Sequence, residues 1–116
     1  MCRQFGSWQF GSLTINNAQR YHFRMIKSFK CEETERLHKG ERIARFVNIE
    51  RVAVRKLKQV QLAKRVEDLR VPPGNRLEKL TGDRAGQYSI RINDQWRVCF
   101  IFECGSAYEV EIADYH

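Results

Sequence analysis

Residues 87–112, QYSIRINDQWRVCFIFECGSAYEVEI, decide the fold, because apolar and polar side chains alternate through most of this stretch. Such alternation is typical of a half-buried β-strand. The alternation is interrupted at Asn93 and Asp94 and again at Cys104, Gly105 and Ser106, where we predict tight hairpins. The stretch therefore predicts an antiparallel β-meander.

The alternation also divides the predicted strands into two faces. One face carries apolar rows from all three strands: Tyr88, Ile90 and Ile92, then Trp96, Val98, Phe100 and Phe102, then Tyr108, Val110 and Ile112. The other face carries Arg91 and Arg97, with Cys99 and Ile101 beside Arg97. We expect the core on the apolar face, since a sheet with one solvated face shows this pattern.

The sequence before the meander predicts helices. The acidic residues Glu32, Glu33 and Glu35 suit the start of a short helix that ends near Gly40. From about residue 47 to 64, apolar residues recur at spacings of 4, 4 and 3, which predicts a longer amphipathic helix. The apolar positions are Ile49, Ala53, Leu57 and Val60, and basic residues on mostly other faces are Arg51, Arg55, Lys56, Lys58 and Lys64.

Short strands complete the predicted fold. Ile26 and Phe29 suit a strand before the first helix, and a second short strand is expected over residues 76–80, after the turn that begins at Pro72. The fold class expected from this order is α+β, with the N-terminal strand and the helices packed on one face of a twisted, mainly antiparallel sheet.

Composition indicates one domain with an anionic partner. The chain has 116 residues and a formal charge of +7, a balance that favours nucleic acid as the partner. The basic residues of the long helix are more typical of a solvated face than of a direct contact. No apolar run approaches the roughly 18 residues of a membrane span, so we expect a soluble, cytoplasmic protein that does not contact the membrane.

The first 24 residues differ from the rest. They contain no acidic residue and show no periodicity, so we interpret residues 1–24 as an extension, either disordered or a mis-assigned start, with Met25 as the alternative start. The domain is expected over residues 25–116. The four cysteines form no CxxC pair, so we expect no metal and no cofactor.

Arg91 and Arg97 flank the first predicted hairpin and form a candidate phosphate clamp. For Arg91, an ion pair with Glu109 or Glu111, or a solvated position over the core edge, is the favoured alternative. Arg97 lies on a partly buried face, where an unpaired cation is costly, so it requires either a protein carboxylate or a ligand phosphate.

The chain ends with Asp114, Tyr115 and His116. Pairing of the last two strands would bring this end close to Arg97. Arginine, imidazole, phenol and carboxylate are the groups needed to cleave an RNA phosphodiester by its own 2′-OH, which requires a base, an acid and positive charge at the phosphorane. The alternatives are an amphipathic sheet tyrosine and a solvated terminal histidine.

Several segments together resemble the HigB-type toxins of the RelE/ParE superfamily of bacterial toxin–antitoxin modules. They are IKSF (26–29), PPGNRLE (72–78), GDRAGQYSIRIN (82–93), QWRVCF (95–100) and the terminal DYH (114–116). The resemblance covers residues 25–116.

The resemblance implies a microbial-ribonuclease-like fold and cleavage of mRNA in the ribosomal A site. It also implies binding to the 30S subunit, no cofactor, and neutralisation by a HigA-like helix-turn-helix antitoxin, with a toxin that is monomeric when alone. In this reading Arg97 stabilises the phosphate, and Asp114, Tyr115 and His116 form the C-terminal catalytic group. Arg84, Arg91 and Lys79 would bind RNA.

Two positions depart from the family pattern. Glu78 stands where some members have a catalytic histidine, and Thr81 stands where a lysine can occur. A carboxylate is a weaker base than imidazole near neutrality, so lower activity or a different codon preference is expected.

Two other functions use the same features. The first is a non-enzymatic inhibitor of DNA gyrase, as in ParE-type relatives, against which the terminal Asp-Tyr-His argues. The second is an RNA-binding module without cleavage, whose sheet aromatics stack on bases. The position of Trp96, Phe100 and Phe102 on the apolar row favours core packing over such stacking.

Overall fold

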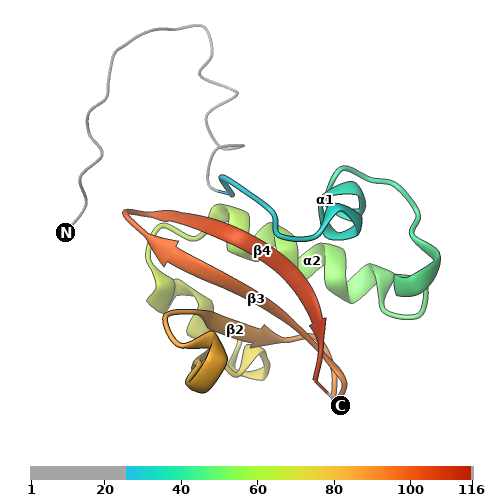
Figure 1. The fold of residues 1–116 in the computed structure, drawn as a ribbon. Helices are drawn as coiled ribbons and strands as arrows, with labels where there is room; N and C mark the ends of the chain where they lie inside the picture. Colours follow the sequence, from blue (N-terminus) through green and yellow to red (C-terminus); the bar gives the residue numbers. More distant parts are fainter. Residues whose placement is uncertain (1–25, 116) are drawn as a thin grey trace, which may run out of the picture.

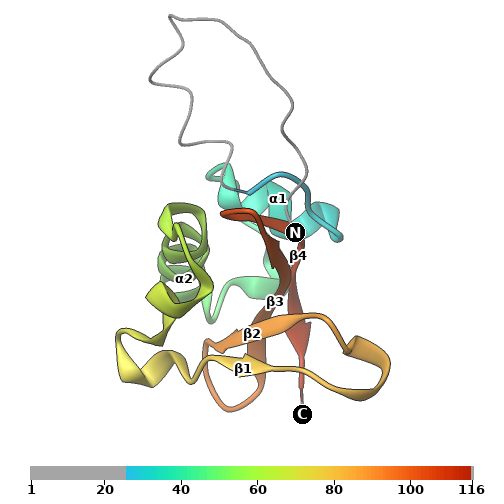
Figure 2. The ribbon, with the colours of Figure 1, turned by 90° about the vertical axis from the view of Figure 1, so that its left-hand side faces the viewer.

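A four-stranded antiparallel sheet in the order β1-β2-β3-β4 forms one layer of the structure (Figures 1 and 2). Its strands are β1 (Glu78–Lys79), β2 (Tyr88–Arg91), β3 (Trp96–Glu103) and β4 (Ser106–Asp114). The predicted meander is confirmed, although β1 is shorter than expected. The computed structural model describes residues 26–115, so the predictions for residues 1–24 and for His116 lie outside the described residues.

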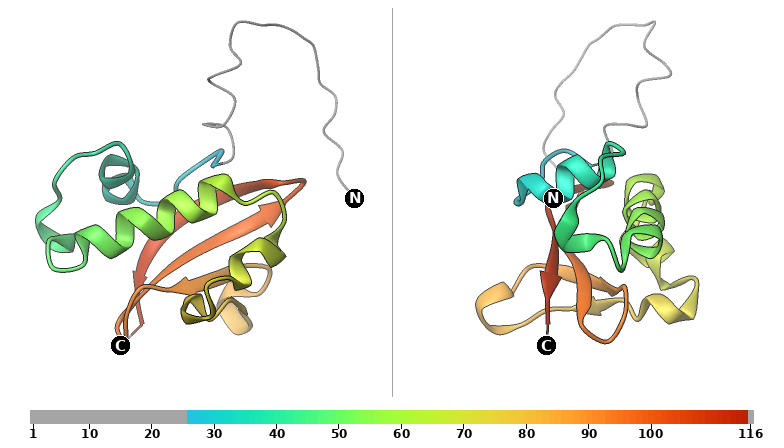
Figure 3. Two further views of the ribbon diagram at one scale, coloured as in Figure 1. Left: turned by 180° about the vertical axis from the view of Figure 1, so that it is seen from behind. Right: turned by 90° about the vertical axis from the view of Figure 1, so that its right-hand side faces the viewer.

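Two α-helices form the second layer, as predicted. They are α1 (Glu32–His38) and α2 (Glu50–Leu62), and α2 runs across one face of the sheet (Figure 3). Short 3₁₀ helices occupy the connections: η2 (Ala44–Phe46), η3 (Val66–Arg70), η4 (Pro73–Asn75) and η5 (Gly82–Arg84). The long helix starts later than predicted because η2 and a turn precede it. Among the described helices, none has the length and apolar character needed to cross a membrane.

The core lies between α2 and the sheet. Phe46, Leu57, Val98 and Phe100 are fully buried there, and Trp96 packs edge-on against Phe46 with ring centroids 5.6 Å apart. Phe102 is partly buried against the same cluster. The aromatic residues of β3 therefore belong to the core and do not form a platform for RNA bases.

A β-bulge in β4 changes which residues face the core. Cys99 pairs with Glu111 and Ile101 pairs with Tyr108, so Glu109 and Val110 together oppose Phe100. Glu109 has a positive φ of 55°. The extra residue reverses the alternation beyond it. As a result Ala107 takes a core position, and the prediction that Tyr108 lies on the apolar row is wrong.

The predicted N-terminal strand is a pair of parallel bridges to β4. Ile26 pairs with Ala107 and Phe29 with Val110. Lys30 N donates to Val110 O over 3.0 Å, and Val110 N donates to Ser28 O over 3.1 Å. The segment therefore covers the outer edge of β4 and brings Lys30 beside it, which blunts an edge that would otherwise be open.

The left-handed backbone at Glu109 predicts opposite effects for two substitutions. Glu109→Gly should raise the free energy of unfolding by about 1 kcal/mol, because a side chain in this conformation is strained. Glu109→Val should lower it by about 1 kcal/mol, because a β-branched residue is strained further. Urea denaturation of both variants measures the difference. Equal destabilisation by glycine and valine would show that the bulge is not present.

Candidate active site

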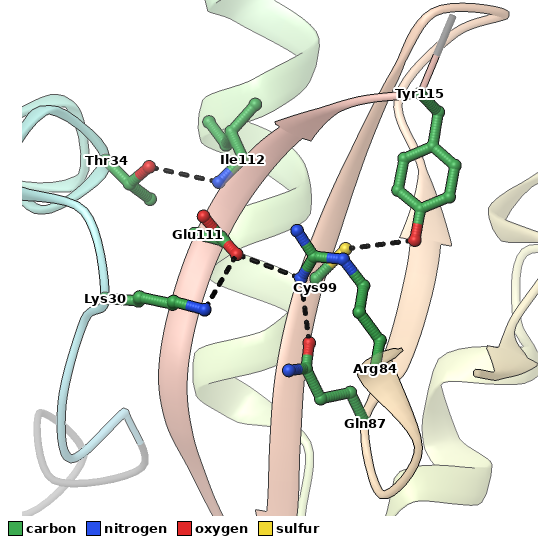
Figure 4. A network of polar contacts seen from close by, with 8 residues as sticks. All are labelled: Lys30, Thr34, Arg84, Gln87, Cys99, Glu111, Ile112 and Tyr115. Carbon is green, nitrogen blue, oxygen red and sulfur yellow. Dashed lines mark hydrogen bonds and ion pairs between the residues drawn. The ribbon is translucent and has the colours of Figure 1, made fainter. Parts of the chain in front are cut away.

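The sheet face turned away from α2, which we call the site face, carries a polar cluster (Figure 4). Strand register aligns Ser89, Cys99 and Glu111 on neighbouring strands, and it aligns Arg91 with Arg97 in the next row. Residues directly opposite one another in an antiparallel pair point to the same side of the sheet. The alternation that buries Val98 and Phe100 in the core therefore presents Arg97 and Cys99 on the site face.

Arg97 is the most constrained cation on this face. Its Nε donates to Ser89 Oγ over 2.8 Å and its Nη2 donates to the Arg76 carbonyl over 2.8 Å. Glu78 Oε1 lies 3.8 Å from Nη2. Only 12% of the Arg97 side chain is exposed, so a partner anion is needed. The structure thus brings together two predicted site residues, Arg97 and Glu78, and of the two anions considered for Arg97 it contains the protein carboxylate.

Arg84 reaches over the sheet from η5 and pairs with Glu111 of β4 (Figure 4). Its Nη1 donates to Glu111 Oε2 over 3.0 Å and to Gln87 Oε1 over 3.1 Å. Lys30 Nζ lies 3.9 Å from the same carboxylate oxygen. The hydrogen bond with Glu111 raises the pKa of Arg84. This network joins the N-terminal segment, β4 and the η5 turn across the site face.

Tyr115 extends this cluster at the end of β4. Its backbone N donates to Gln95 O over 2.6 Å, and its Oη is hydrogen-bonded to Cys99 Sγ over 3.8 Å. Burial and the neighbouring Cys99 raise the pKa of the phenol, while Arg84 and Arg97 act in the opposite direction. The hydroxyl is therefore protonated near neutrality and can donate a hydrogen bond.

Other predicted site residues lie elsewhere. Asp114 pairs with Trp96, so its place in the strand is on the core-facing side, and Gln95 Nε2 donates to its carboxylate over 3.1 Å. Lys79 pairs with Tyr88, which places it on that same side at the edge strand. The register places Asp114 beside Trp96, on the other side of the strand end from the Tyr115 hydroxyl that contacts Cys99, and its approach to Arg97 stays a prediction.

Arg91 shares the site face with Arg97, but its partner is neither of the two glutamates predicted from the sequence. Its Nη2 donates to Asp94 Oδ1, in the hairpin that follows β2. The suggested pairing with Glu109 or Glu111 is wrong, since the hairpin itself provides a carboxylate three residues away.

Sequence reasoning missed two groups that hold Arg97. One is the Ser89 hydroxyl. Alternation predicted that Ser89 shares a face with Arg91, but it did not predict the hydrogen bond from Arg97 to Ser89. The other is the backbone carbonyl of Arg76, for which the sequence carries no signal, because the contact depends on how the turn after η4 is folded.

Burial raises the pKa of the Cys99 thiol, and the thiol is fully covered by its neighbours. Because the thiolate is the reactive form, we predict that iodoacetamide at about pH 8 leaves Cys99 unmodified in the folded protein and alkylates it after denaturation. Peptide mass spectrometry reads out each site, with the partly exposed Cys31 as the internal comparison. Equal labelling of Cys99 and Cys31 in the folded protein would contradict the described burial.

Comparison with known proteins identifies the family of the chain. Residues 27–116 match the family model for the RelE-like toxin of type II toxin-antitoxin system HigB. Toxin HigB-1 of Vibrio cholerae is 38% identical over 85 residues, which cover 72% of this chain and 90% of that protein. Endoribonuclease HigB of Proteus vulgaris is 44% identical over 41 residues, 35% of this chain and 45% of that protein. The chain belongs to the HigB family of RelE-like toxins of type II toxin–antitoxin systems.

Proposed function

We propose that this toxin is a ribosome-dependent endoribonuclease that cleaves mRNA in the A site and so inhibits translation. The main support for this proposal is that Arg97, Arg84 and Tyr115 lie on one face of the sheet. Glu78 lies beside Arg97. A related protein is named an endoribonuclease, which supports the reaction class.

The proposed reaction is attack of the RNA 2′-OH on the adjacent phosphorus. The 2′-oxygen forms a bond to phosphorus, the bond to the 5′-oxygen breaks, and a cyclic phosphate and a 5′-hydroxyl result. One base removes the 2′ proton and one acid protonates the leaving oxygen. Arg97 would stabilise the charge of the phosphorane, since it is already fixed in place before the charge develops.

We assign the proton-transfer roles to the residues around Arg97. Glu78 is the candidate base, because its carboxylate is more than half exposed and faces the guanidinium. Tyr115 donates a hydrogen bond to a phosphate oxygen. His116, the next residue in the chain, is the proposed acid, and Asp114 is the proposed support for this end of the chain. Arg84 and Arg91 are proposed to bind RNA around the scissile phosphate, and Lys79 is proposed to bind RNA at the edge of the sheet.

The ribosome would supply the remaining positioning. Arg51, Arg55 and Lys58 lie on the exposed side of α2, and among the described residues they have no ion-pair partner. We propose that they contact ribosomal RNA of the 30S subunit, as an exposed row of cations does with phosphates. The proposed partner that neutralises the toxin in the cytoplasm is a HigA-like helix-turn-helix antitoxin.

Arg97→Ala together with His116→Ala should abolish mRNA cleavage, because both the phosphate charge and a proton donor are lost. We expect a decrease of about 100-fold or more on induction, measured by mapping mRNA 5′ ends. Arg42→Ala is the matched control, since it removes an arginine whose side chain is 73% exposed and pairs with Glu50 of α2. Equal cleavage by wild type and the double variant would refute the site.

Substitutions at Glu78 test the role of the general base separately from the roles of the other site residues. Glu78→Gln keeps the shape and removes the base, and we expect the cleavage rate on programmed ribosomes to decrease by about 100-fold. Glu78→His should retain cleavage and make it depend on a group that titrates at about pH 6.5. A glutamine variant as active as wild type would remove Glu78 from the mechanism.

The same preparations test the alternatives. Inhibition of gyrase supercoiling by purified protein, with translation unaffected, would favour the non-enzymatic inhibitor. Binding to ribosomes without any new mRNA 5′ ends would favour an RNA-binding module.

A further inference from the structure

Arg97 is held from two directions by groups that do not belong to the proposed catalytic set. We infer that Ser89 and the left-handed turn at Arg76 are positioning residues, which fix the Arg97 guanidinium so that its Nη1 side is presented to the scissile phosphate. The inference rests on the proposed function for the identity of the phosphate, but the geometry that it describes can be measured without cleavage.

Ser89 provides the first constraint. Its side chain is fully buried in β2, and its Oγ accepts the Nε–H of Arg97 over 2.8 Å. A buried hydroxyl and a buried N–H that satisfy each other define one rotation of the guanidinium plane, because either group left alone is costly. Ser89 therefore determines the orientation of the Arg97 guanidinium group, in addition to filling space between β1 and β3.

The backbone at Arg76 provides the second constraint. Its carbonyl accepts Arg97 Nη2 over 2.8 Å, and its φ and ψ of 46° and 58° lie in the left-handed region. A residue with a side chain rarely adopts this conformation, and where it does, the surrounding structure holds it there. The side chain of Arg76 is exposed, so its own packing does not explain the conformation.

Asn75 holds this turn in place from the core side. The residue is fully buried and accepts a hydrogen bond from Lys56 Nζ of α2. Its Nδ2 donates to Gln59 Oε1 over 2.9 Å and to Leu69 O over 3.1 Å. Lys56, predicted among the outward cations of the helix, is only 7% exposed, and burial lowers its pKa. A buried amide with this many partners leaves the next residue little conformational freedom.

These constraints leave one side of the guanidinium available. Arginine has five N–H groups, of which Nε uses one on Ser89 and Nη2 faces Arg76 and Glu78. Within residues 26–115, Nη1 has no protein partner. A phosphate oxygen that approaches from the site face would therefore meet N–H groups that are already aimed, which lowers the cost of ordering them at the moment of reaction.

A double-mutant cycle on programmed ribosomes tests the role of Ser89. Ser89→Ala should lower kcat by about 10-fold with KM little changed, because only the orientation of Arg97 is lost. In an Arg97→Lys background, which lacks the Nε–H, Ser89→Ala should cause no further loss. Ser106→Ala, at the opposite end of the sheet, is the matched control and should resemble wild type. A Ser89 effect of equal size in both backgrounds would overturn the inference.

A pair of variants at one position tests the turn. Arg76→Gly and Arg76→Val both remove the same side chain, but glycine accepts the left-handed conformation and valine does not. We expect the valine variant to have a kcat about 10-fold lower than the glycine variant per folded molecule. Equal kcat values for the two variants would show that the carbonyl of Arg76 does not position Arg97.

Hydrogen exchange of the Arg97 Nε–H, followed by NMR, separates this inference from the proposed function. The proton should be protected in wild type and in Ser106→Ala, and it should exchange much faster in Ser89→Ala. If wild-type protein is inactive on ribosomes and the proton is protected as described, the proposed function fails and the positioning stands. Fast exchange in the wild-type protein would overturn the positioning whatever the activity.

Discussion

The structure depends on the burial of β3 on both of its faces. Val98 and Phe100 point into the core against α2, and Cys99 between them is equally buried on the site face. Because side chains alternate with a period of two, a shift of one residue in the register would place Arg97 in the core and Val98 among the charges. The packing of the core therefore also determines the position of the polar cluster, and the two cannot vary independently.

Charge on the site face is closely compensated. Each of the three arginines of this face has a carboxylate: Arg84 has Glu111, Arg91 has Asp94 and Arg97 has Glu78. A phosphate that enters the face meets guanidinium groups that are ordered and paired, so it shares these cations with the carboxylates, and at Arg97 it can approach the Nη1 side. This arrangement agrees with the proposal that the ribosome contributes much of the binding energy, since free RNA gains little from paired cations.

The strands and the two faces of the sheet could be predicted from alternation alone, because nearly every residue from 87 to 103 follows it. The exception was Tyr108, where the bulge at Glu109 depends on a single left-handed residue that is not a glycine. The need of a partly buried Arg97 for an anion could be predicted, but its pairing with Glu78 could not, because it depends on the register of β1 beside β2. The hydrogen bond from Arg97 to the Arg76 carbonyl could not be predicted. Every residue has a backbone carbonyl, and only the folded turn brings that of Arg76 within reach of Arg97.

Long-range placement was harder to predict than local structure. The reach of Arg84 from η5 to Glu111 spans 27 residues of sequence, and it depends on how the turn folds over the sheet. Asp114 and Tyr115 are neighbours, yet the register pairs Asp114 with Trp96 on the core-facing side, while the Tyr115 hydroxyl contacts Cys99 on the site face. The buried Lys56 was assigned to the solvated side of its helix, since its position beside Leu57 gave no sign of the buried Asn75 that accepts its hydrogen bond.

The proposed function requires that the face of β3 opposite the core bind the RNA backbone. The most direct measurement is the NMR map of backbone and arginine side-chain shifts on titration with a short RNA whose reacting 2′-OH is replaced by hydrogen. We expect the largest shift changes at Ser89, Arg97 and Tyr115, with the α1 region unchanged. Changes confined to α1 and α2, with Ser89 and Arg97 unaffected, would contradict it.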